Sequence, residues 1–131
     1  MKYLVMIYGN PLNWAHPMYQ HDPNFLALPE EERAEITRRA EEFWQELRES
    51  GEFVAGVALA DPGLTRTIRG RDGVPVVTDG PFLEAKEQLA GYFVVDCESA
   101  ARAEEIGSRF PDARFAAVEV RPIMEMAGQE M

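Results

Sequence analysis

The sequence has few of the residues that carry disulfide, metal and nucleic-acid chemistry. Cysteine occurs once, at Cys97, so no disulfide can form within the chain and a cysteine-based metal site is excluded. Lysine and arginine total 13 against 23 aspartates and glutamates, and the formal net charge of -10 argues against binding to nucleic acid. Histidine occurs only at His16 and His21, without the helical spacing of a metal site, and we expect neither a metal nor a cofactor.

Long hydrophobic runs are also absent, so no segment is expected to span or bind a membrane. Residues 1–5 carry one charge and a short apolar run, unlike a signal peptide, and the expected compartment is the cytoplasm. A chain of 131 residues that is 46% hydrophobic and 27% charged predicts one globular domain over residues 1–131. Asp96 and Glu98 flank Cys97 and would raise the pKa of its thiol, which predicts a buried, passive cysteine.

Hydrophobic periodicity predicts strands and helices along most of the chain. Strands are expected at 3–8, 52–60, 64–69, 74–78, 92–95 and 115–120, and helices at 29–50 and at 98–109, where Pro111-Asp112 ends the second helix. Residues 10–28 are rich in proline and predict an extended irregular connection that packs back through Trp14, Tyr19 and Phe25. Residues 123–131 are expected to form a tail.

This order of elements predicts an α+β fold. Strand, helix, strand, hairpin, strand, helix, strand matches a ferredoxin-like βαββαβ plan with an extra β-hairpin in a mainly antiparallel sheet. Both helices then cover one face of the sheet, although its strands are apolar on both faces, so a symmetric homodimer is expected to cover the other. The 10–28 segment could do part of that covering. Gly56 and its neighbouring alanines would let a backbone, a ring or a ligand come close.

The connector at residues 76–92 contains an unusual turn, Asp79-Gly80-Pro81. An aspartate in a turn commonly accepts the backbone N–H two residues on, but that residue is Pro81, which has none. Asp79 must therefore find another donor, such as the Phe82 amide, Lys86, an arginine or water. Phe82 is expected to anchor the loop in the core, and the Gly80–Pro81 peptide could be cis or trans.

The polar cluster that follows the turn has two interpretations. It is either a solvated bend whose ion pairs are each worth less than about 1 kcal/mol, or part of a cleft that performs acid–base chemistry or binds an anion. His16 could bring an imidazole near Asp79, although histidines in a proline-rich loop are more often surface residues. The candidate catalytic residues are Asp79, Lys86, Glu87 and His16, and the candidate substrate-binding residues are Tyr8, Arg66, Phe82, Glu84 and Tyr92.

The same connector carries a resemblance to a known family. The runs 77–82 (VTDGPF) and 84–89 (EAKEQL), followed by Gly91-Tyr92, closely resemble the DGPF group of the YCII-related family, and the resemblance extends over nearly the whole chain. It implies a ferredoxin-like dimeric α/β barrel, and related proteins have been proposed to use a His–Asp pair. The chain departs from the group in its long 10–28 segment and at residues 55–57, where a Gly-Gly-Glu pattern is common.

Two functions are consistent with these residues. The first is binding or transformation of a small polar molecule in a cleft lined by the bend at residues 79–82. The alternative is a non-catalytic dimeric interaction module that relays a signal to a regulatory protein, because members of the DGPF group tend to be encoded near alternative sigma factors. The residues favour the cleft function, and they leave open whether the protein is an enzyme.

Overall fold

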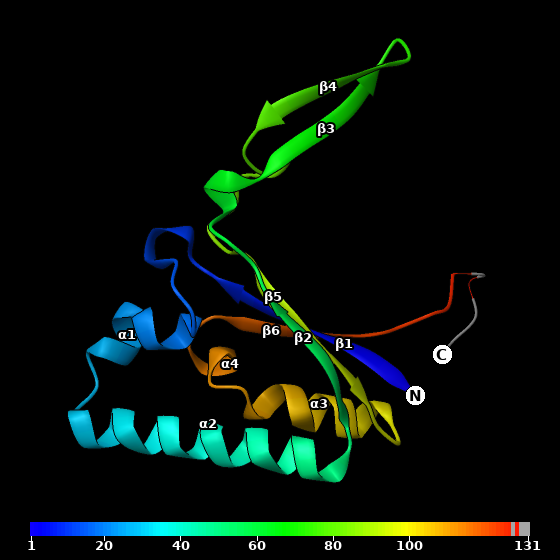
Figure 1. Ribbon diagram of the computed structural model, residues 1–131. Coiled ribbons are helices and arrows are strands. Elements are labelled where there is room, and N and C mark those ends of the chain that lie inside the picture. The colour runs from blue at the N-terminus through cyan, green and yellow to red at the C-terminus, as the bar shows by residue number, and fades with distance from the viewer. Residues whose placement is uncertain (127, 129–131) are drawn as a thin grey trace.

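The computed structural model describes residues 1–126 and residue 128 (Figure 1). Residues 127 and 129–131, the end of the predicted tail, lie outside the described residues. The strands are β1 (Lys2–Gly9), β2 (Phe53–Ala58), β3 (Arg66–Arg71), β4 (Val74–Asp79), β5 (Gln88–Asp96) and β6 (Ala117–Pro122). The helices are α1 (Pro23–Leu26), α2 (Glu30–Ser50), α3 (Ala100–Arg109) and α4 (Asp112–Phe115), with short 3-10 turns at Pro11–Asn13, Met18–His21 and Pro62–Leu64.

Four of the strands form the main sheet, in the order β2-β5-β1-β6 with every neighbouring pair antiparallel. This is the strand order of a ferredoxin-like α+β fold, as the sequence predicts. Strands β3 and β4 form a separate two-stranded sheet inserted between β2 and β5. Figure 1 shows this hairpin projecting from one end of the main sheet, and we call residues 66–79 the arm.

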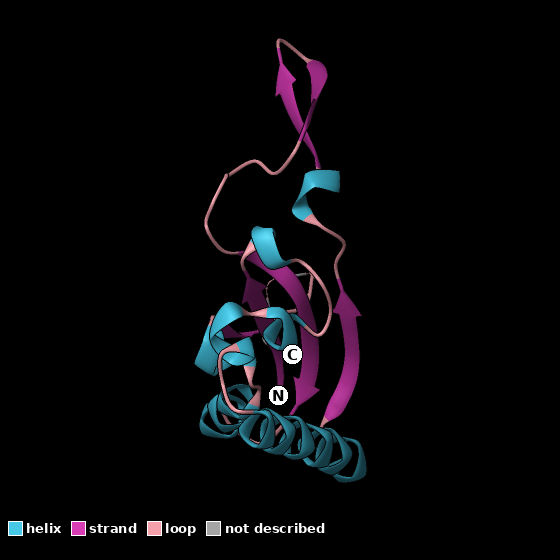
Figure 2. Cartoon of the chain, turned by 90° about the vertical axis from the view of Figure 1, so that its left-hand side faces the viewer, coloured by secondary structure: helices cyan, strands magenta, loops and turns pink. Residues whose placement is uncertain are grey.

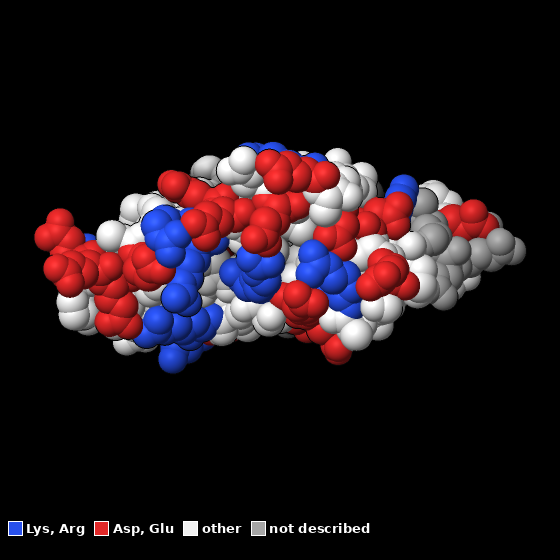
Figure 3. Space-filling model, turned by 90° about the horizontal axis from the view of Figure 1, so that it is seen from below, with Lys and Arg blue, Asp and Glu red and all other residues white. Residues whose placement is uncertain are grey.

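Helix α2 begins and ends where its sequence predicts. Pro29 precedes its first turn, where Glu30, Glu31 and Glu32 lie at the positive end of the helix dipole. Gly51 ends the helix with a φ of 79°, a left-handed conformation that glycine adopts without a steric penalty. The exposed side of α2 carries interspersed acidic and basic side chains, including the ion pairs that Glu35 forms with Arg38 and Arg39 (Figure 3).

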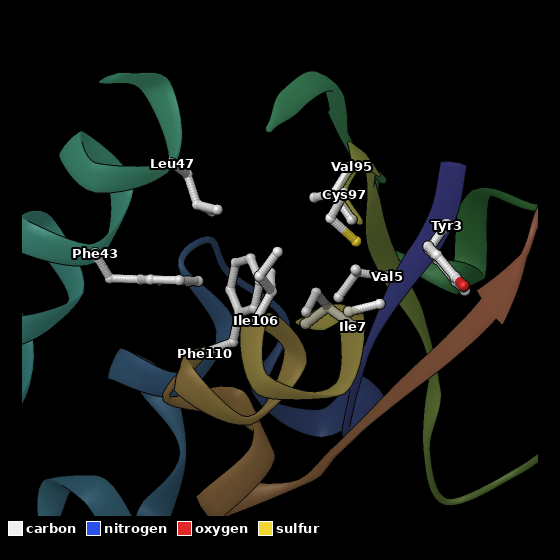
Figure 4. Close-up of a cluster of buried hydrophobic side chains, with 10 residues drawn as sticks. Tyr3, Val5, Ile7, Phe43, Leu47, Val95, Cys97, Ile106 and Phe110 are labelled. Carbon is white, nitrogen blue, oxygen red and sulfur yellow. The ribbon is translucent and has the colours of Figure 1, made fainter. Parts of the chain in front are cut away.

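The core lies between the helices and one face of the main sheet (Figure 4). Because successive side chains of a strand point to opposite faces, Tyr3, Val5 and Ile7 of β1 are all buried on this side. Phe43 of α2 meets Phe110 edge to face, with ring centroids 5.1 Å apart. Ser99 caps α3 by accepting a 3.1 Å hydrogen bond from the Arg102 backbone N–H, which confirms its predicted role.

None of the described helices packs on the opposite face of the main sheet (Figures 1 and 2). On this side Leu4 lies opposite Val94, Met6 lies opposite Tyr92, and Val57 of the edge strand lies opposite Tyr92. These five side chains, which we call the open face, are half-buried or exposed, and Val57 is 40% exposed. The apolar face that the sequence predicts is therefore present.

Several boundaries differ from the predicted ones. Strand β5 begins at Gln88 rather than residue 92, so the end of the connector is paired with β1 instead of forming a loop. The last strand begins at Ala117 because residues 112–115 form α4. Strand β3 begins at Arg66 because Asp61 caps a short 3-10 turn just before it. Tyr19 and Phe25 are buried, which confirms that the 10–28 segment packs back onto the body.

Candidate functional site

A cavity of about 360 Å³ lies between the helix-covered side of the sheet, α2 and the segment around residues 16–20. Its apolar lining includes Ile7, Met18, Ala40, Trp44, Ala58, Ala90, Phe93 and Phe110, and its polar lining comprises His16, Tyr19, Gln20, Thr37, Glu41 and Asp112. Val57, a residue of the open face, also borders the cavity, because it lies on the edge strand. A cavity of this size, mostly apolar with a few polar groups, is typical of small-molecule sites.

Three aromatic rings form one wall of the cavity. The Trp44 ring lies 4.8 Å from that of Phe93 and 5.5 Å from that of Phe110, while Phe93 and Phe110 stack with centroids 5.0 Å apart. Gly56 makes room for this wall, since a Cβ atom there would lie 2.6 Å from Cδ1 of Phe93. The predicted close approach at Gly56 is thus confirmed, and what approaches is an aromatic ring.

Asp112 is the buried carboxylate of the cavity, only 8% exposed at the start of α4. Burial disfavours its charged form and raises its pKa from 3.8 to about 6. Backbone N–H groups of Asp112 itself and of Tyr19 donate to the carboxylate, and the nearby His16 also lowers the pKa, but burial outweighs them. A carboxyl group that titrates near pH 6 in a cavity is suited to exchanging protons near neutral pH.

His16 lies at the exposed rim of the cavity and is held by the chain segment that leaves β2. Its Nε2 lies 2.7 Å from the carbonyl oxygen of Leu59, and the Trp14 indole donates to the same oxygen at 3.1 Å. A carbonyl can only accept a hydrogen bond, so Nε2 of His16 carries a proton and Nδ1 is the acceptor of the neutral ring. The ring is therefore fixed in one orientation beside the cavity.

Asp79 forms an ion pair with an arginine, one of the donors that the sequence predicts for it. Nε of Arg66, directly opposite on β3, lies 3.1 Å from the carboxylate, and both side chains are largely exposed. Gly80, with a φ of 88°, lies at the base of the arm and links its two strands. Its N–H donates to the Thr65 carbonyl, and its carbonyl accepts from the Thr67 hydroxyl, each at 2.7 Å. The Gly80–Pro81 peptide bond is trans, because His16–Pro17 is the one cis peptide bond among the described residues.

The remaining predicted residues lie apart from the cavity. Glu84, Lys86 and Glu87 are exposed in the connector after the arm. Phe82 is 64% exposed with the Arg69 guanidinium 5.1 Å from its ring centroid, so the prediction of a core anchor is wrong.

Tyr8 and Tyr92 lie on the uncovered side of the sheet. A hydrogen bond to Glu119 raises the pKa of the Tyr8 hydroxyl, with burial adding to the shift. Tyr92 belongs to the open face, opposite Met6 of β1. Among the described residues, His16 is the one predicted site residue that lines the cavity.

Asp112 is the residue that sequence reasoning missed. In the sequence it follows Pro111 at the end of a helix, where an aspartate is an ordinary turn residue. The backbone N–H of the distant residue Tyr19 donates to its carboxylate, and no local pattern encodes that contact. Cys97 is buried as predicted, and burial, rather than the flanking carboxylates, is the main cause that raises the pKa of its thiol.

Comparisons with known proteins support the family resemblance of the connector. The family model described as YCII-related domain matches residues 1–127. An uncharacterized protein of Rhizobium meliloti (strain 1021) is 30% identical over 107 residues, which cover 80% of this chain and 86% of that protein. Within the described part of the chain, every helix is too short or too polar to cross a membrane.

Proposed function

We propose a function for this chain, which belongs to the YCII-related domain family. It binds a small molecule in the 360 Å³ cavity and exchanges a proton with that molecule through Asp112. The observation that supports this most strongly is a carboxyl group, 8% exposed, whose pKa of about 6 places its titration near neutrality inside a mostly apolar cavity.

The lining favours one class of ligand. The wall of Trp44, Phe93 and Phe110 suits a flat, largely apolar ring. Glu41 and Asp112 are the carboxylates of the lining, so a neutral or cationic ligand is favoured over an anion. An amine or hydroxyl on the ring would hydrogen-bond to the Asp112 carboxylate.

Asp112 and His16 supply the groups for acid–base chemistry on such a ligand. Ionised Asp112 accepts a proton from a donor on the ring, and protonated Asp112 returns it, which are the two halves of general acid–base catalysis. His16 presents Nδ1 as a second acceptor at the rim, because Nε2 is engaged with Leu59. In this proposal Asp112 is the proton-exchanging residue and His16 assists at the entrance.

The functions predicted from the connector compete with this one. A polar ligand bound by Asp79, Lys86 and Glu87 at the bend remains a proposal, supported by the exposure of these three side chains in one connector. A relay to a regulatory protein, the DGPF group assignment and a cytoplasmic location likewise remain proposals. The proposed homodimer is supported by the uncovered apolar side chains of the open face.

Saturation-transfer NMR with a panel of one-ring aromatic compounds, each bearing one amine, hydroxyl or carboxylate, separates the two sites. Ala58→Phe fills the cavity, Ala34→Phe places the same ring at an exposed position of α2 that does not line the cavity, and Asp79→Asn alters the bend. We expect the compounds that bear an amine or a hydroxyl to bind the wild type, Ala34→Phe and Asp79→Asn. Ala58→Phe should abolish this binding. Binding that survives Ala58→Phe but is lost in Asp79→Asn would assign the ligand to the bend instead.

A further inference from the structure

The turn and the base of the arm determine which backbone groups of its two strands bond to each other. Asp72 and Gly73, with φ of 50° and 76°, join β3 to β4 in a two-residue turn, and the residues that flank such a turn form a hydrogen-bonded pair. At the base, the Gly80 N–H donates to the Thr65 carbonyl at 2.7 Å. Hydrogen-bonded and non-hydrogen-bonded pairs alternate in an antiparallel ladder. The hydrogen-bonded pairs of the arm are therefore Thr67–Thr78, Arg69–Val76 and Arg71–Val74.

The two outer edges of the arm differ in what they offer to a further strand. The residues between the hydrogen-bonded pairs direct their backbone groups outward. They are Arg66, Ile68 and Gly70 on β3 and Pro75, Val77 and Asp79 on β4. Pro75 has no N–H to donate, so the β4 edge is blunted. The β3 edge contains no proline, and among the described residues β4 is the one strand paired with β3 (Figures 1 and 2). The β3 edge can therefore accept a third strand.

Two arginines lie beside this edge on one face of the arm. Arg69 and Arg71 are two residues apart on β3, so they project from the same face, which we call the cationic face. Although the chain has a formal net charge of -10, neither arginine forms an ion pair with any residue that the structure describes. The Arg69 guanidinium lies over the Phe82 ring instead, 5.1 Å from its centroid. A hollow of about 410 Å³ on this face is lined by both arginines and by no described carboxylate, so it favours an anionic group.

We propose that the β3 edge of the arm binds an extended acidic segment of a partner protein as a third, antiparallel strand, in which carboxylates alternate with apolar side chains. The carboxylates lie opposite Arg69 and Arg71, because alternate residues of the added strand have the same spacing of about 7 Å as these two arginines. The apolar side chains lie opposite Ile68 and Gly70 and cover Ile68, which is 66% exposed. Backbone hydrogen bonds to the edge supply affinity, and the alternating side chains supply specificity.

Other occupants match fewer of these features. Two copies of the chain paired through their β3 edges would bring their arginines together on one face, where like charges repel. Nucleic acid is disfavoured by the formal net charge of -10. A small anion would fill the hollow but would leave the backbone groups of the edge and the Ile68 side chain uncovered. The site is separate from the ligand cavity, because no residue of the arm lines that cavity.

Fluorescence anisotropy of the full chain tests this with a labelled seven-residue peptide in which glutamate and valine alternate, beginning and ending with glutamate. In the proposed complex the valines lie opposite Ile68 and Gly70 and direct their N–H groups to β3, whereas the glutamates direct theirs outward. Methylation of the valine nitrogens removes the donors that face the arm. Methylation of the glutamate nitrogens is the matched control, and a peptide with lysine in place of glutamate reverses the charge.

Charge-reversal variants of the protein test the arginines. Arg69→Glu and Arg71→Glu place a like charge opposite the glutamates of the peptide, and Arg39→Glu makes the same change in net charge at an exposed position of α2. We expect the Kd of the glutamate–valine peptide to rise about 10-fold or more in the two arm variants and on methylation of the valines. Arg39→Glu and methylation of the glutamates should change it by less than about 3-fold, and the lysine peptide should bind at least about 10-fold more weakly.

Four results would overturn the proposal. They are a wild type that does not bind the peptide, equal weakening by the two methylations, equal weakening by Arg39→Glu and the arm variants, and binding of a seven-nucleotide single-stranded DNA in place of the peptide. Circular dichroism checks that each variant keeps the fold. The comparison of the two methylated peptides uses the unaltered protein, so it decides the matter even if an arm variant fails to fold.

Discussion

The titration of Asp112 predicts how the stability of the protein depends on pH. Its pKa is raised from 3.8 to about 6 by burial, so the folded protein holds this proton over a pH range in which the unfolded chain has released it. The stabilisation that results is fully present below about pH 4 and is lost as the pH rises through about 6. Above that pH the carboxylate is buried in its charged form.

The size of the effect follows from the shift. At about 1.4 kcal/mol per pKa unit, ionised Asp112 costs the folded state about 3 kcal/mol near pH 7.5. Asp112→Asn keeps the shape of the side chain and removes the titration. Its amide introduces a donor that needs a partner, at a cost of about 1–3 kcal/mol, but that cost does not vary with pH.

Urea unfolding of the wild type and Asp112→Asn between pH 4 and 7.5 measures the difference, because most other titrations cancel between the two proteins. We expect Asp112→Asn to gain about 2–3 kcal/mol of unfolding free energy relative to the wild type across this range, mostly between pH 4 and 6. Parallel curves for the two proteins would show that Asp112 titrates as an ordinary exposed carboxyl and would refute the reasoning.

Three further substitutions test contacts that stabilise the body of the protein. Glu52 accepts hydrogen bonds from Arg102 Nε at 2.9 Å and Nη2 at 2.7 Å, and both side chains are mostly buried, so Glu52→Gln should lower the unfolding free energy by about 1–3 kcal/mol at pH 7. Arg102 lowers the pKa of Glu52, so that loss should shrink as the pH falls below about 4, and a loss independent of pH would contradict the pairing. Gly56→Ala should push the Phe93 ring and cost about 1–3 kcal/mol in urea unfolding, whereas an unchanged midpoint would mean that the ring moves freely. Ser99→Ala removes the cap of α3 and should cost about 1 kcal/mol, which a thermal melt would detect as a fall of a few degrees; no fall would show that the cap is redundant.

The order of elements could be predicted from sequence because local chemistry determines it. Glu30, Glu31 and Glu32 favour the start of α2 and Gly51 ends it, while the apolar run in β1 predicts a central strand. These are interactions between residues close in sequence, which a pattern can encode.

The position of the cavity could not be predicted in the same way. The charged turn around Asp79 is conspicuous in sequence, yet it lies at the base of the arm, where Phe82 is exposed rather than anchored in the core. Asp112 looks like an ordinary turn residue, yet it is buried and accepts a hydrogen bond from the Tyr19 backbone N–H in the distant 10–28 segment. Both outcomes depend on contacts between distant segments, and residue type alone does not specify them.

The two tryptophans offer the most direct measurement of the central claim, that a small molecule binds in the cavity. The Trp44 ring is part of the aromatic wall, whereas the Trp14 indole N–H donates to the Leu59 carbonyl beside His16. In a ¹H–¹⁵N spectrum, titration with a one-ring aromatic amine should shift the Trp44 indole signal strongly in the wild type and leave it unchanged in Ala58→Phe. Shifts confined to the arm or connector amides, with both indole signals unmoved, would contradict the claim.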